Sequence, residues 1–126
     1  MMKADALSLQ ITQLKEIAEL NRDEGGFMSS EEYEETVKYC LEHLDKAMHN
    51  WETATHALER FSSKIGNLDK EYDNKTILVV GHGFTINLYF AKILGVPDKV
   101  YERFGKNSYA DWGIIKGQNV VKDIAV

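Results

Sequence analysis

Residues 76–94 read TILVVGHGFTINLYFAKIL and divide into three parts with different patterns. The first part, Thr76 to Val80, is apolar at nearly every position and rich in β-branched residues, which is typical of a strand covered on both faces. A Gly81-His82-Gly83 turn follows, and apolar residues then recur at helical spacing until Gly95. This order predicts a strand that delivers a histidine to the start of a helix.

The turn has the chemistry of an anion site. The first N–H groups of a helix have no intrahelical partners and carry the positive end of its dipole, so they attract phosphate. Two other motifs fail here, because a dinucleotide fingerprint needs glycine where Ile86 stands and a nucleophile elbow needs serine where His82 stands. A tight turn without a ligand remains as the alternative.

The flanking segments predict further helices and a hairpin. Ser29 and Glu32 have the spacing of a capping box, and an apolar stripe follows them as far as Trp51. With a break near Asn50, a second helix is expected from Glu52 to the Gly66-Asn67 pair. Beyond Pro97 we expect a short helix over 98–104 and strands over 109–115 and 120–125.

Composition limits the class of protein. The 126 residues, 44% of them hydrophobic, suffice for one globular domain. A net charge of −5 argues against binding to nucleic acid or to an anionic membrane surface. No apolar run approaches the ~18 residues of a membrane span, and the first residues do not resemble a signal peptide, so we expect a cytoplasmic protein.

The sequence predicts neither a metal site nor a cofactor. The single cysteine, Cys40, excludes an internal disulfide and lies on an apolar stripe, where we expect a buried small hydrophobe. On one continuous helix His49, Glu52 and His56 would share a face, but the break near Asn50 separates them.

Several segments resemble the histidine phosphatase superfamily, also called phosphoglycerate mutase-like. Val79 to Asn87 resembles the V-V-S-H-G-G-x-I-R segment that carries the second catalytic histidine of the family. Ile93 to Pro97 is similar to the family's L-G-x-P helix end, and Lys106 to Ala110 to its N-x-S-V strand entry. Glu52 to Phe61 resembles an E-T segment with a downstream arginine, and Leu14 to Asn21 the stretch with the general-acid glutamate.

This resemblance implies a fold class. We expect an α/β protein, a partial phosphoglycerate mutase-like sandwich, in which a helix-rich N-terminal half precedes a small sheet with the His82 strand at its centre. Residues 1–126 would form a single incomplete domain. Its parts would be a helical cap and general-acid region over 11–70 and an α/β core part over 75–126.

The resemblance also implies site residues. His82 would stabilise a transferring phosphoryl group, Glu19 would protonate the leaving oxygen, and Gly83 and Phe84 would bind phosphate. Family members also carry an Arg-His-Gly strand with the nucleophilic histidine, but no Arg-His pair occurs in this chain. We therefore expect a phosphomonoester hydrolase or phosphotransferase that is truncated and inactive as an isolated chain, so that its status as an enzyme stays open.

The alternative is a non-catalytic anion-binding or oligomerisation module derived from that fold. The expected ligand is phosphate or a small phosphorylated metabolite. In the resembled fold the Arg-His-Gly strand lies beside the strand Thr76 to Val80, so its absence would leave backbone and apolar groups uncovered. We therefore expect a homo-oligomer that covers this edge.

Overall fold

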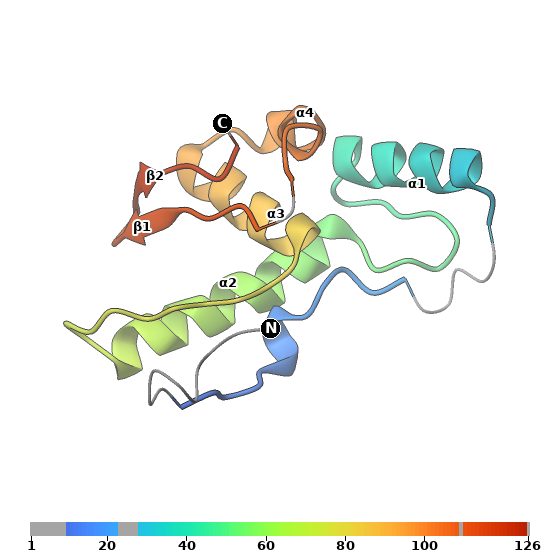
Figure 1. Cartoon of the computed structure of the whole chain (residues 1–126). Coiled ribbons are helices and arrows are strands. Elements are labelled where there is room, and N and C mark those ends of the chain that lie inside the picture. The colour runs from blue at the N-terminus through green and yellow to red at the C-terminus, as the bar shows by residue number, and fades with distance from the viewer. Residues whose placement is uncertain (1–9, 23–27, 109, 126) are drawn as a thin grey trace.

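The computed structural model describes residues 10–22, 28–108 and 110–125 (Figure 1). In chain order the elements are η1 (Lys15–Ile17), α1 (Ser30–Glu42), α2 (Ala54–Glu71), α3 (Gly83–Leu94), η3 (Pro97–Lys99), α4 (Val100–Phe104), β1 (Ile114–Lys116) and β2 (Asn119–Lys122). Helix α3 is central, because it contacts α2, α4 and β2, while α1 packs against α4 (Figure 1). The helix-rich α/β class with a small sheet is therefore confirmed.

Helix α1 begins at the predicted capping box. The Ser29 hydroxyl accepts from the Glu32 N–H at 3.1 Å, and the Glu32 carboxylate accepts from the Ser29 N–H at 3.3 Å. The helix ends at Glu42, however, so the expected continuation of the helical stripe to Trp51 is wrong. The backbone reverses at His49 and Asn50, whose φ angles of 57° and 62° lie in the left-handed region.

Helix α2 starts as predicted and ends later than predicted. The Thr53 hydroxyl accepts from the His56 N–H at 3.1 Å and caps the helix. The expected stop at Gly66-Asn67 is wrong, because the helix continues to Glu71. Glycine weakens a helix interior by only about 1 kcal/mol relative to alanine, so one such residue does not end an amphipathic helix that packs along α3.

The segment predicted as the central strand is not a strand. Residues 75–82 contain neither helix nor strand, and in the described part of the chain the sheet consists of β1 and β2 alone. The side chains of Ile77, Leu78 and Val80 are 41%, 70% and 72% exposed. An apolar pattern favours burial, but a strand also needs a neighbour for its ladder, and no described segment provides one.

The hairpin is confirmed, although its strands are shorter than expected. Strands β1 and β2 pair antiparallel, with Ile115 opposite Val120 and Lys116 opposite Asn119. Gly117 turns the chain at φ 63°, a conformation that suits glycine. The short helix predicted over 98–104 is present as η3 and α4.

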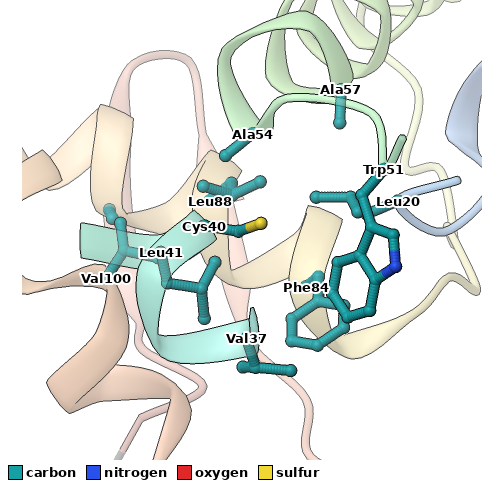
Figure 2. Close-up of a cluster of buried hydrophobic side chains, with 11 residues drawn as sticks. Leu20, Val37, Cys40, Leu41, Trp51, Ala54, Ala57, Phe84, Leu88 and Val100 are labelled. Atoms are coloured by element: carbon teal, nitrogen blue, oxygen red, sulfur yellow. The ribbon is translucent and has the colours of Figure 1, made fainter. Parts of the chain in front are cut away.

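The core lies between helices α1, α2, α3 and α4 (Figure 2). Its buried members are Leu20, Val37, Cys40, Leu41, Trp51, Ala54, Ala57, Phe84, Leu88, Ala91 and Val100. Cys40 is 1% exposed, as expected for a small hydrophobe, and burial raises the pKa of its thiol. Across the described residues, no helix combines the length and the apolar character needed to cross a bilayer.

Candidate functional site

His82 stands immediately before the first residue of α3. It is the N-cap residue, with extended backbone angles of φ −123° and ψ 158°. Its side chain makes no cap hydrogen bond, and it is exposed. Across residues 10–22, 28–108 and 110–125, no side chain or backbone group is hydrogen-bonded to its imidazole ring. The ring is therefore accessible to a ligand at the helix N-terminus.

Glu19 lies against the same turn, although it is far from His82 in the sequence. Its carboxylate accepts from the backbone N–H groups of Phe84 at 3.0 Å and Thr85 at 3.1 Å, and from that of Leu20 at 3.0 Å. Hydrogen bonds to a carboxylate at a helix N-terminus are charge-assisted and benefit from the dipole. The fold thus places the Glu19 carboxylate on the first turn of the helix that begins directly after His82.

The two residues expected to bind phosphate lie in this first turn of α3. The Phe84 N–H is already donated to Glu19, so a phosphate there would compete with a carboxylate. Gly83 is exposed, and a Cβ atom on it would stand 3.7 Å from Cε1 of Phe104, which is ordinary contact. The roles of His82, Glu19, Gly83 and Phe84 in binding or catalysis stay predictions.

Arg60 holds the Glu19 segment in place from α2. Its guanidinium donates to the backbone carbonyls of Glu16 and Ala18, both at 2.8 Å, and to that of Glu19 at 3.0 Å. It also donates twice to the Glu52 carboxylate, from Nε and from one terminal nitrogen, both at 2.8 Å. The loop that presents Glu19 is therefore tied to α2 through one side chain.

Glu52 completes this anchor. Its carboxylate also accepts from the Asn21 N–H at 3.0 Å and contacts the His56 ring. Burial pushes the pKa of Glu52 upward, but the hydrogen bonds from Arg60, Asn21 and His56 outweigh it and lower that pKa to about 2. Glu52 is therefore ionised at neutral pH, as an anchor for a guanidinium must be.

Arg103 forms a second polar cluster, which links α4 to α3 and to the segment after β2. Its guanidinium binds Asp123 through two hydrogen bonds of 2.8 and 2.6 Å, and its Nε donates to the side chain of Asn87 at 3.2 Å. The Asn87 amide in turn donates to the Val100 carbonyl at 2.9 Å. Arg103 hydrogen-bonding lowers the pKa of Asp123. The resembled motif often has arginine at the position that Asn87 occupies in this chain. Here Arg103 of α4 donates a hydrogen bond to the Asn87 side chain.

The histidines of the α1–α2 region do not assemble with Glu52 into a cluster. His56 pairs with Glu52, whereas His49 lies in the left-handed turn before α2. Among the described residues, no group of three or more histidine, cysteine or carboxylate side chains is arranged to hold a metal ion.

The sequence suggests Glu19 and His82 as site residues but does not indicate the role of Arg60. Glu52 and Arg60 lie in a segment that resembles the family. The carbonyls that Arg60 contacts are more than 40 residues away along the chain, so no local sequence pattern predicts these contacts.

A known protein family matches nearly the whole chain. Residues 2–124 match the family model described as histidine phosphatase superfamily (branch 1). No curated protein and no solved structure matches the chain. The chain belongs to the histidine phosphatase superfamily.

Proposed function

We propose that the turn at His82 is a phosphate site of the histidine phosphatase type, which binds phosphate or a small phosphomonoester. The observation that carries this proposal is the Glu19 carboxylate held against the first turn of α3, the helix that His82 precedes as its N-cap residue. In a complete site His82 would stabilise the transferring phosphoryl group, and Glu19 would protonate the leaving oxygen.

The proposed site lacks a nucleophile within these 126 residues. No arginine stands immediately before a histidine in the sequence, and the remaining histidines, His43, His49 and His56, lie at the end of α1, between α1 and α2, or on α2. When several catalytic residues act together, removal of the nucleophile lowers the rate of the catalysed reaction by a factor of roughly 10⁴ to 10⁶. The chain by itself is therefore a phosphate binder with little turnover, and a different polypeptide would have to supply the nucleophilic histidine.

Binding of inorganic phosphate to the 126-residue chain tests this function. We expect isothermal titration to detect phosphate binding that His82→Ala weakens at least ~10-fold, because a hydrogen bond to a charged group contributes about 1.5 kcal/mol or more. His49→Asn is the matched control: it removes another exposed histidine and should leave the affinity unchanged. Absence of binding, or equal binding by His82→Ala, would refute the proposed site.

Hydrolysis of p-nitrophenyl phosphate separates binding from catalysis. The wild-type chain should give the background rate, and His82→Ala should give the same rate. Hydrolysis above background that disappears in His82→Ala would contradict the proposed inactivity and would favour a competent enzyme.

A second candidate function is oligomerisation, and the exposed apolar side chains of Ile77, Leu78 and Val80 favour it. They follow one another in a segment without a ladder partner among the described residues, and such edges pair readily with another chain. We expect self-association at micromolar concentration, measured by size-exclusion chromatography with light scattering. Leu78→Lys should shift the protein toward monomer, whereas a wild-type monomer would exclude this candidate.

A further inference from the structure

We propose that Arg22 is the cation that binds the phosphate group of a ligand at the His82 turn. This inference rests on the proposed function, because it names the positive charge of the same site. The other two arginines of the chain, Arg60 and Arg103, already have their donors committed elsewhere. Arg22 differs from both in its partners and in its position.

Arg60 has no donor left for a ligand. A guanidinium offers five N–H groups, and the five hydrogen bonds of Arg60 to Glu52 and to three backbone carbonyls use them all. Arg103 is 9% exposed and forms a two-bonded pair with Asp123. Neither can accept a phosphate without losing its present partners, so neither provides the cation of the site.

Arg22 has no acidic partner within the described residues. Its guanidinium donates to the hydroxyl of Tyr33, and its other contacts are with aromatic ring faces. The guanidinium carbon lies 5.2 Å from the ring centroid of Phe84, 5.7 Å from that of Tyr33 and 5.8 Å from that of Trp51. The rings hold the cation by cation–π attraction, yet they leave N–H groups at its edge for an anion.

The position of Arg22 connects it to the turn. It follows Glu19 by three residues, and it stands over the ring of Phe84, whose backbone N–H binds the Glu19 carboxylate. Phe84 is itself the second residue after His82. Figure 2 shows Phe84 and Trp51, two of the three rings, side by side at one end of the core cluster. The guanidinium is therefore fixed beside the first turn of α3.

Charge balance gives Arg22 its function. A phosphate that approaches His82 meets the Glu19 carboxylate at the helix N-terminus, and two like charges repel each other. A guanidinium offsets this repulsion and can bind two phosphate oxygens at once. This role could not be predicted from local sequence, because the rings that hold Arg22 lie 11 or more residues away along the chain.

Tryptophan fluorescence provides the test. In a Trp112→Phe background Trp51 is the remaining tryptophan of the chain, and it lies against Arg22. Titration with inorganic phosphate at constant ionic strength should change its emission. We expect Arg22→Gln to weaken phosphate binding roughly tenfold, as loss of a charge-assisted bidentate contact does. Lys15→Gln, with the same charge change in an exposed position of the same segment, should bind phosphate as the background protein does.

The outcomes separate this inference from the proposed function. If Arg22→Gln binds phosphate like the background protein while His82→Ala does not, Arg22 is not the cation and the phosphate site stands. If the background protein itself binds no phosphate, the proposed function fails and this inference fails with it. If circular dichroism shows Arg22→Gln to be unfolded, Arg22→Met decides. Methionine keeps packing against the aromatic rings but removes the charge, so we expect roughly tenfold weaker binding, and unchanged affinity would overturn the inference.

Discussion

Replacing Arg60 with methionine should lower the free energy of unfolding by about 2–4 kcal/mol. The substitution leaves the Glu52 carboxylate, whose side chain is only 11% exposed, without its cationic partner. It also removes the donor shared by the carbonyls of Glu16, Ala18 and Glu19. Methionine has a similar length and replaces most of the packing, so the loss measures the polar anchor and not a cavity.

Urea denaturation followed by circular dichroism at pH 7 measures this loss. Lys64→Met is the matched control, since it removes a positive charge from the same helix at a side chain with no polar partner among the described residues. The double variant Arg60→Met, Glu52→Met should recover part of the stability, because it no longer leaves a carboxylate unpaired. A loss below ~0.5 kcal/mol for Arg60→Met, the range typical of surface substitutions, would show that the anchor does not stabilise the fold.

The pairing of Arg60 with Glu52 should also make the free energy of unfolding depend on pH in the acid range. The pKa of Glu52 is about 2 in the folded chain against 4.5 for an unperturbed glutamate. A lowered folded-state pKa stabilises the protein above the unfolded-state pKa, and this contribution is lost as the pH falls from about 4.5 toward 2. Allowing for solvent at this partly exposed pair, it amounts to roughly 1–2 kcal/mol. Arg60→Met should lose less stability than wild type over that interval.

Elements with local signals could be predicted from the sequence. The capping box at Ser29 fixes the start of α1, and Gly95, with φ 75°, ends α3 at the predicted residue. The turn at Gly117 places the hairpin. Each of these features depends on residues within one turn of each other, so the chain needs no distant partner to form them.

Features that depend on distant partners could not be predicted in this way. An apolar run such as Thr76 to Val80 indicates burial, but pairing in a sheet depends on a neighbouring strand that the run itself does not specify. The aromatic cage of Arg22 is similar, because its rings come from α1, from the loop before α2 and from α3. Glu19 could be suggested from a motif, whereas its hydrogen bonds to the start of α3 follow from the fold.

Replacing Arg103 with methionine should also lower the free energy of unfolding by about 2–4 kcal/mol. Arg103 is 9% exposed, and its guanidinium joins α4 to Asp123, which follows β2, and to Asn87 of α3. Without it, Asn87 keeps its bond to the Val100 carbonyl but loses the donor to its buried side-chain oxygen. The variant therefore leaves the Asn87 side-chain oxygen without a donor and the Asp123 carboxylate without its cation, at the junction of three elements.

Comparison with two variants identifies the source of the Arg103 effect. Lys106→Met removes a positive charge from an exposed side chain near the end of α4 and should change stability by less than ~0.5 kcal/mol. Asp123→Asn retains the shape of the partner but not its charge, so its cost should lie between the two. The pKa of Asp123 is lowered in the folded protein, so wild type should lose stability as the pH falls below the usual range of an aspartate. Arg103→Met should show less of this loss, and equal acid sensitivity in both proteins would mean that the Arg103–Asp123 pair does not stabilise the junction of α3, α4 and β2.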